Sequence, residues 1–117
     1  NIIDQRVGNL TPKFISYTLS KSSLWTLTRT LALGLAPRIR VNAIGPGPTL
    51  RSDRQNDKQF QRQCQSVPLG HGPDIAEIWD AVSYLVSAQS VTGQMIVVDG
   101  GEQMGWAQPS DGIIQEE

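Results

Sequence analysis

The segment from Ser16 to Ala36 is the feature that most constrains the fold of this 117-residue chain. It is rich in Leu, Ala, Thr and Ser, and this composition predicts one long helix. Its large apolar residues are spread around most of the helix circumference: Leu19, Leu24, Trp25, Leu27, Leu31, Leu33 and Leu35. We therefore expect the helix to be buried on more than one side. Pro37 should end it, because proline cannot continue a helix.

Three short stretches have the composition of strands, near residues 1–4, 39–45 and 94–98. The second, from Ile39 onward, leads into a turn that is rich in glycine and proline. Open α/β sheets place ligands at the carboxyl ends of parallel strands, where glycine lets the backbone approach a ligand closely. An ordinary strand-to-loop turn is the alternative. The candidates for contact with a cofactor are Gly45, Pro46, Gly47 and Thr49.

Tyr17 and Lys21 stand four residues apart in the predicted helix, so their side chains share one face. A nearby ammonium group favours phenolate, and we therefore expect Lys21 to lower the pKa of Tyr17 from its usual value of about 10. A tyrosine tuned in this way can donate a proton to a carbonyl or imine. Asp4 precedes Tyr17 and completes three candidate catalytic side chains. A solvated surface turn is the alternative explanation of the Tyr–Lys pair.

In combination, these pieces resemble the short-chain dehydrogenase/reductase family. The resemblance covers residues 1 to about 106. Its motifs, in chain order, are Tyr17-x-x-x-Lys21, Ala32-x-x-Leu35-Ala36-Pro37, Arg40-Val41-Asn42-Ala43-Ile44-Gly45-Pro46-Gly47, Thr92-Gly93-Gln94 and Val98-Asp99-Gly100-Gly101. The resemblance implies an α/β fold, namely the carboxyl-terminal half of a Rossmann-type, doubly wound parallel sheet with three strands and two long helices. Residues 1–106 would form this part of the domain, and residues 107–117 a flexible tail.

The glycine-rich dinucleotide fingerprint that follows the first strand of such a fold is absent from this sequence. We therefore expect the chain to be the carboxyl-terminal portion of a longer protein. Three parallel strands make a poor independent sheet, because parallel strands need cover on both faces. The isolated piece should be marginally stable, sticky or oligomeric, and inactive by itself.

The resemblance also implies roles for individual residues. Tyr17 would be the proton donor, and Lys21 would bind the nicotinamide ribose and lower the tyrosine pKa. The backbone at Pro46 and Gly47, with the Thr49 hydroxyl, would hold the nicotinamide carboxamide. The implied cofactor is NADP as NADPH, with NAD left open. The implied assembly is a homotetramer. The composition agrees with a location in the cytoplasm.

Asp4 departs from the family pattern, which usually has serine at this position. A subset similar to pteridine reductases and dihydromonapterin reductases carries aspartate there instead. A carboxyl group can bind or relay a proton to the ring nitrogens of a pterin, whereas serine can only hydrogen-bond a carbonyl. Asp4 therefore favours pterin reduction. The alternatives are a carbonyl reductase of unknown substrate, with Asp4 as a turn residue, and a truncated, non-catalytic fragment.

The region from Arg51 to Gly72 is polar and predicts a mobile loop with a short helix. In the family this region closes over the substrate, so Arg51 and Arg54 would either meet a polar substrate or a cofactor phosphate, or remain solvated. Pro73 and Asp74 should begin another helix. Its apolar residues have helical spacing and predict a core or subunit-packing face: Ile75, Ile78, Trp79, Val82, Leu85 and Val86.

Composition argues against two kinds of partner. The net charge is −1 with 18% charged residues, which does not suggest a nucleic-acid surface, and no apolar run approaches the roughly 20 residues that span a membrane. Cys64 is the single cysteine, so an internal disulfide is excluded, and no His/Cys spacing suggests a metal site. A small-molecule substrate is the expected ligand.

Overall fold

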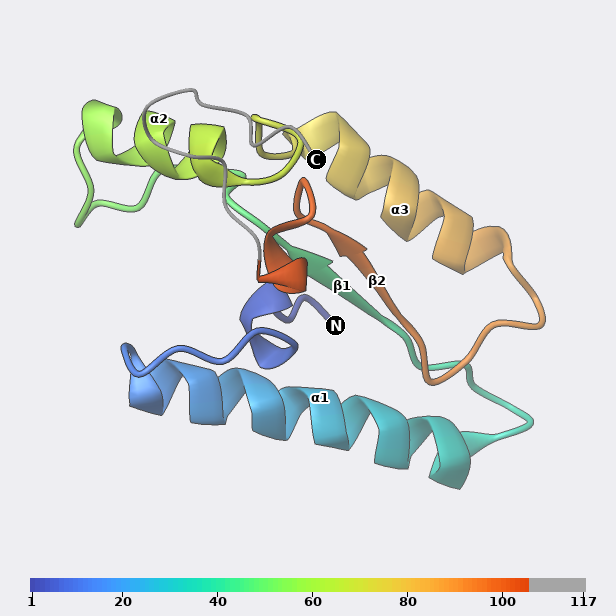
Figure 1. The fold of residues 1–117 in the computed structure, drawn as a ribbon. Helices are drawn as coiled ribbons and strands as arrows, with labels where there is room; N and C mark the ends of the chain where they lie inside the picture. Colours follow the sequence, from blue (N-terminus) through green and yellow to red (C-terminus); the bar gives the residue numbers. More distant parts are fainter. Residues whose placement is uncertain (106–117) are drawn as a thin grey trace, which may run out of the picture.

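The computed structural model describes residues 1–105, and these contain three α-helices, two short 3₁₀ helices and two parallel strands (Figure 1). The elements, in chain order, are η1 (Gln5–Val7), α1 (Ile15–Leu35), β1 (Ala43–Pro46), α2 (Asp57–Ser66), α3 (Ile75–Ser87), β2 (Met95–Val98) and η2 (Glu102–Met104). The predicted α/β architecture with a parallel sheet is confirmed. The tail predicted for residues 107–117 lies outside the described residues.

Within residues 1–105 the sheet has two strands, and the first of the three predicted strands is reduced to a single bridge. β1 and β2 pair in parallel, with Ala43 opposite Met95. The start of the chain joins β1 through a single parallel bridge between Ile2 and Ile44. The Ile3 N–H donates to the Ile44 carbonyl at 2.8 Å. All three predicted strand segments therefore lie side by side, but the first is a bridge, and the second begins at Ala43 rather than at residue 39.

Just before β1, side-chain bonds add to the backbone bond that the Gly93 N–H donates to the Val41 carbonyl at 2.8 Å. The Arg40 guanidinium donates to the carbonyls of Leu85, Val86 and Val91 at 2.7, 2.8 and 3.1 Å. The Asn42 amide donates to the Val91 carbonyl at 2.8 Å, and its oxygen accepts from the Gln94 N–H at 3.0 Å. The bonds from Arg40 satisfy the Leu85 and Val86 carbonyls at the end of α3, which have no partner within the helix. They fix the end of α3 and the start of β2 against β1.

α1 and α3 lie on opposite sides of the sheet (Figure 1). Within α1 only Thr28 and Ala32 are buried, and Leu19 and Leu33 are 63% and 83% exposed. The prediction that this helix is buried on more than one side is wrong for the described chain. The physical reason is that only one face of α1 has neighbours among residues 1–105, so the apolar residues on its other faces meet solvent.

α3 shows the same division. Asp74 caps it, since its side chain accepts from the Glu77 N–H, and Leu85 is buried toward the strands. Ile75 and Trp79, by contrast, are 63% and 67% exposed. The apolar face predicted for this helix therefore splits into an inner stripe that packs and an outer stripe without cover in the described part of the chain.

The short helix predicted in the polar region is α2, and none of its residues is buried. Val67, directly after α2, is 1% exposed and anchors this region to the core. The other buried apolar residues are Ile3, Ala32, Ala43, Ile44 and Leu85. Among residues 1–105, no helix is long and apolar enough to cross a membrane.

Candidate active site

Asp4 and Tyr17 are in direct contact. Asp4 follows the first strand segment and caps η1, because its Oδ1 accepts from the Arg6 N–H at 2.7 Å. Its Oδ2 accepts the Tyr17 hydroxyl at 2.7 Å. Tyr17 stands in the first turn of α1, so this hydrogen bond joins the end of the first strand segment to the start of the long helix.

Lys21 lies one turn further along α1. Its Nζ donates to the Ile2 carbonyl at 3.3 Å and lies 5.7 Å from the centroid of the Tyr17 ring. The helical spacing thus places the two side chains together. An ammonium group has three N–H donors, so Lys21 can donate to a ligand while it holds Ile2.

The pKa of Tyr17 is raised to about 12, because burial and the hydrogen bond and charge of Asp4 all disfavour the phenolate. The positive charge of Arg6 lowers it in part. The prediction that Lys21 lowers this pKa is wrong for this structure, because Asp4 contacts the hydroxyl directly whereas the ammonium lies beside the ring. Tyr17 therefore keeps its proton at neutral pH, which is the form that a proton donor needs.

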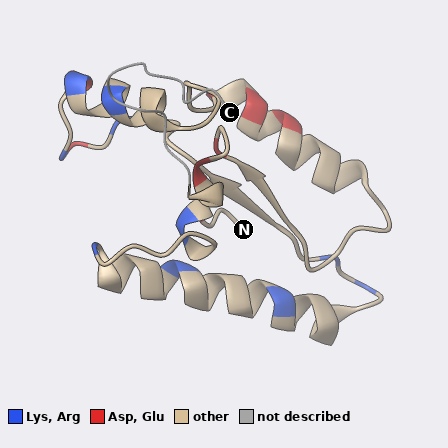
Figure 2. Ribbon diagram, viewed as in Figure 1, with Lys and Arg blue, Asp and Glu red and all other residues tan. Residues whose placement is uncertain are grey.

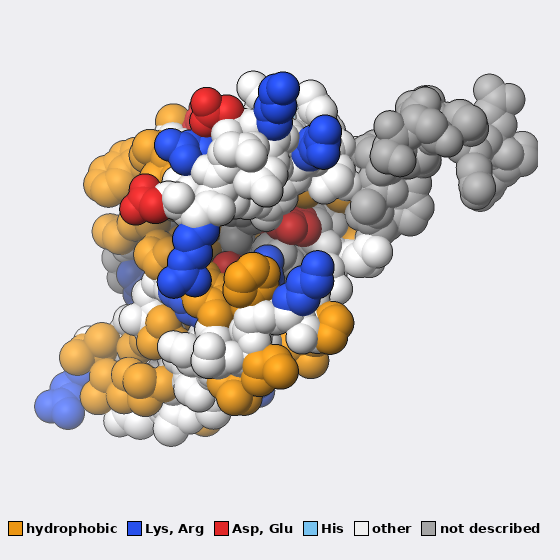
Figure 3. Space-filling view, turned by 90° about the vertical axis from the view of Figure 1, so that its left-hand side faces the viewer, with side chains coloured by type: hydrophobic (Ala, Val, Ile, Leu, Met, Phe, Trp, Pro, Cys, Tyr) orange, Lys and Arg blue, Asp and Glu red, His pale blue; other side chains and the backbone are white. Residues whose placement is uncertain are grey.

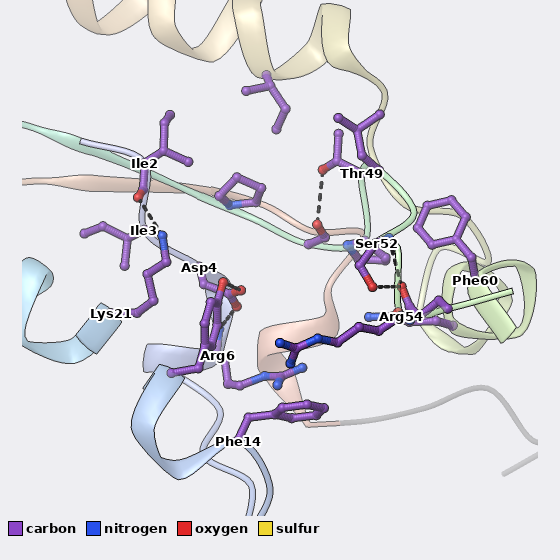
Figure 4. A pocket seen from close by; sticks show the side chains of 18 of the residues that line it. Ile2, Ile3, Asp4, Arg6, Phe14, Lys21, Thr49, Ser52, Arg54 and Phe60 are labelled. Carbon is purple, nitrogen blue, oxygen red and sulfur yellow. Dashed lines mark hydrogen bonds between the residues drawn. The ribbon is translucent and has the colours of Figure 1, made fainter. Parts of the chain in front are cut away.

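These side chains line an open cavity of about 1140 Å³. Figure 4 shows Asp4 and Lys21 on one wall and Thr49 on another. In the space-filling view of Figure 3, Lys and Arg side chains stand on both sides of the hollow. Five of the six predicted positions for cofactor contact line it, namely Tyr17, Lys21, Pro46, Gly47 and Thr49.

Gly45 is the predicted position that does not line the cavity. It lies within β1, where an added Cβ would stand 3.0 Å from the Met95 Sδ. An added Cβ at Gly47 would stand only 2.6 Å from the Asp99 Cα. Close packing of β1 on β2 therefore explains both glycines, and at Gly47 it also brings bare backbone to the cavity.

Arg6 and Phe14 also line the cavity, and neither was predicted from the sequence. Arg6 reaches it because η1 turns the chain directly after Asp4, and no periodic pattern marks such a short turn. The sequence analysis gave Arg51 and Arg54 the same possible roles, but the structure places only one of them at the cavity. Arg54 lines the cavity, whereas Arg51 does not and instead forms an ion pair with Asp57 at 3.1 Å.

The part of the chain that the structure describes contains no group of three or more His, Cys, Asp or Glu side chains that could hold a metal ion. The parallel sheet, the cavity at the carboxyl end of β1 and the side chains on α1 define a Rossmann-type α/β protein with its ligand site at the usual edge of the sheet.

Comparison with known proteins gives the family. Residues 4–103 match the family described as enoyl-(acyl carrier protein) reductase. The chain is 33% identical over 104 residues to dihydromonapterin reductase of Klebsiella pneumoniae and 35% identical over 109 residues to glucose 1-dehydrogenase of Gluconobacter oxydans, covering 89% and 86% of this chain. The crystal structure of FolM alternative dihydrofolate reductase 1 from Brucella suis in complex with NADP superimposes with a TM-score of 0.88, at 56% identity over 95% of this chain.

The chain belongs to the short-chain dehydrogenase/reductase family. It spans less than half the length of these relatives, namely 43% of the Klebsiella protein, 41% of the Gluconobacter protein and 44% of the Brucella chain.

Proposed function

We propose that this chain carries the catalytic residues of an NADPH-dependent reductase that acts on a pterin. The observation that carries the proposal is the 2.7 Å hydrogen bond from the Tyr17 hydroxyl to Asp4, in a cavity that Lys21 also lines. The names of the Klebsiella and Brucella relatives, a dihydromonapterin reductase and a dihydrofolate reductase, support a pterin substrate.

Each catalytic side chain has a task that its position permits. Tyr17 supplies the one proton that accompanies the hydride, since its raised pKa keeps it protonated. Asp4 accepts the Tyr17 hydroxyl in the structure, and in the complex it orients the ring nitrogen of the reduced C=N bond and relays this proton from Tyr17 to it. Lys21 uses a free N–H to bind the nicotinamide ribose.

The walls of the cavity fit a nicotinamide group. The backbone of Pro46 and Gly47 is accessible there, and the Thr49 hydroxyl, which donates to the Gly47 carbonyl at 3.1 Å, can turn toward a carboxamide. NADPH, when bound, supplies the hydride. The complex with NADP of the Brucella relative supports NADP over NAD. The cavity volume exceeds what one small ligand requires and leaves room for the hydride acceptor.

Asp4 distinguishes pterin reduction from general carbonyl reduction, and its replacement tests the proposal. The assay follows NADPH oxidation by the natural protein at its full length, with a 7,8-dihydropterin and with a simple ketone. Asp4→Ser should lower kcat/KM for the dihydropterin about 10-fold more than for the ketone, because serine cannot relay a proton to a ring nitrogen. An equal loss on both substrates would reject the pterin preference.

We also propose that the protein acts as a homotetramer in the cytoplasm. Support comes from the apolar side chains that the described residues leave exposed on α1 and α3, such as Leu33 and Trp79, because large exposed apolar areas mark association surfaces. Light scattering after size-exclusion chromatography tests the assembly. A mass of four chains is expected, and a monomer at micromolar concentration would contradict it.

A further inference from the structure

Three cations and two carboxylates line the cavity, and the proposed chemistry uses only some of them. Asp4 and Lys21 belong to the catalytic set. Arg6, Asp53 and Arg54 have no role in that chemistry, although all three line the cavity with the catalytic residues. Figure 2 shows Lys and Arg segments at η1, at the loop before α2 and on α2 itself, whereas α3 carries acidic segments.

Arg54 is an exposed arginine that makes no hydrogen bond or ion pair with any residue from 1 to 105. Arg51, three positions earlier in the same loop, is different. It pairs with Asp57 at 3.1 Å and donates to the Gln55 carbonyl at 2.6 Å. The fold therefore uses the Arg51 guanidinium to shape the loop and leaves the Arg54 guanidinium available at the cavity.

Arg6 is held in place by a ring contact rather than by an ion pair, and its positive charge also acts on the Glu102 carboxyl group. Its guanidinium carbon lies 5.1 Å from the centroid of the Phe14 ring, and no carboxylate of residues 1–105 lies within ion-pair distance of it. Its Nε is buried and has no hydrogen-bond partner among the described residues. A buried N–H without a partner is costly, and a ligand oxygen would remove that cost.

Phe14 keeps Arg6 at the cavity wall. It precedes α1 with φ 57, a left-handed backbone conformation that is unusual for a residue other than glycine. In Figure 4 the Arg54 side chain extends from its loop toward the wall that carries Arg6 and Phe14. Two guanidinium groups that approach one cavity repel each other, and an anion between them would turn this repulsion into attraction.

We propose that Arg6 and Arg54 form an anion subsite that binds a carboxylate carried by the pterin substrate, so that the enzyme prefers carboxylate-bearing dihydropterins to neutral ones. This inference rests on the proposed function. Figure 4 places Lys21 on one side of Asp4 and Arg54 on the other. The cofactor ribose is assigned to Lys21, so the arginines face the far end of the hydride acceptor rather than the cofactor. A guanidinium suits a carboxylate because its donors match both oxygens.

The test compares two substrates in the natural protein at its full length. The charged probe is 7,8-dihydrofolate, whose tail carries carboxylates, and the neutral probe is 7,8-dihydrobiopterin. Arg54→Gln should lower kcat/KM for dihydrofolate about 10-fold, mainly through KM, and leave the neutral probe unchanged. Arg54→Lys should restore part of the loss. Arg6→Gln should act in the same direction, and Arg51→Gln is the matched control that should not change the ratio between the probes.

Three results would overturn the anion subsite. If wild type reduces both probes equally well and Arg54→Gln changes neither, the subsite is wrong while the proposed function stands. If Arg54→Gln raises KM for NADPH and leaves the ratio between the probes unchanged, the arginine binds a cofactor phosphate instead. If wild type reduces neither probe, the proposed function itself is wrong and the subsite falls with it.

Discussion

Two regions that meet at the cavity hold their polar side chains in opposite ways. In the strand framework, defined as residues 40–47 and 91–101, polar side chains bond to distant backbone: Arg40 reaches the end of α3, and Asn42 donates to the Val91 carbonyl and accepts from the Gln94 N–H. In the cavity loop, defined as residues 48–72, the bonds are local, as between Gln55 and Gln63.

The difference shows which wall of the cavity is fixed and which can change. Framework side chains join segments 45 to 52 residues apart in sequence, so replacing one of them should affect the whole fold. Loop side chains mostly bond within the loop, and α2 buries no residue. The loop can therefore exchange polar residues at little cost in stability, and its free Arg54 is where specificity can be set.

Gly47 gives the largest expected contrast. Its alanine variant would place a Cβ 2.6 Å from the Asp99 Cα, a backbone atom that cannot move freely. We expect Gly47→Ala to cost about 3 kcal/mol of unfolding free energy. Gly34, within α1, has nothing within 4 Å of its added Cβ, so Gly34→Ala should stabilise by about 0.5–1 kcal/mol. Urea denaturation measures the unfolding free energy of both variants. Equal changes in the two variants would show that the packing of Gly47 on Asp99 is not a special constraint.

Arg40 gives the next contrast. Arg40→Met removes a donor from three carbonyls at the end of α3 and before β2, and should cost about 2 kcal/mol. Arg38→Met is the control, because the Arg38 side chain is exposed and makes no hydrogen bond to the described residues. Thermal unfolding should separate the two variants. If both lower Tm equally, the bonds of Arg40 do not hold the framework.

Tyr17 links stability to pH. Its pKa of about 12 in the folded protein exceeds the unfolded value of about 10, so its contribution to stability is complete below pH 10 and is lost as the pH rises from about 10 to about 12. Asp4→Asn should move the Tyr17 pKa toward 10. Absorbance titration of the phenolate in a Tyr84→Phe background, where Tyr17 is the sole tyrosine, measures this. An unchanged midpoint would show that Asp4 does not set the pKa.

Removal of the helix caps should give the smallest change in stability, and it compares the cavity loop with the helix that packs on the sheet. Asn56 and Asp74 each form a capping box, on α2 and α3 respectively. Each alanine variant should cost about 1 kcal/mol of local helix stability. Asp74→Ala should lower the global Tm, whereas Asn56→Ala should only speed amide exchange within α2. A comparable loss of Tm in Asn56→Ala would show that the cavity loop is part of the cooperative core.

Local sequence patterns were sufficient to predict part of the candidate site. The four-residue spacing placed Lys21 beside Tyr17, and the glycine-rich turn after the second strand pointed to Pro46, Gly47 and Thr49 at one cavity. These features depend on neighbours in sequence or on a known edge of a parallel sheet.

Other features depend on tertiary contacts that no spacing encodes. The raised pKa of Tyr17 follows from its hydrogen bond to Asp4, and the difference between Arg51 and Arg54 follows from which of them meets Asp57. The apolar residues around α1 predicted burial, yet a pattern of side chains does not say whether a neighbour covers each face. Leu33 remains 83% exposed.

The most direct test of the account is the dihydropterin-dependent oxidation of NADPH by the Tyr17→Phe variant, beside wild type, with the affinity for NADPH measured separately by tryptophan fluorescence. Phenylalanine keeps the ring and removes only the proton that Tyr17 donates. We predict a loss of about 10²- to 10³-fold in kcat with unchanged NADPH affinity. Retention of full kcat by Tyr17→Phe would contradict the assignment of Tyr17 as proton donor.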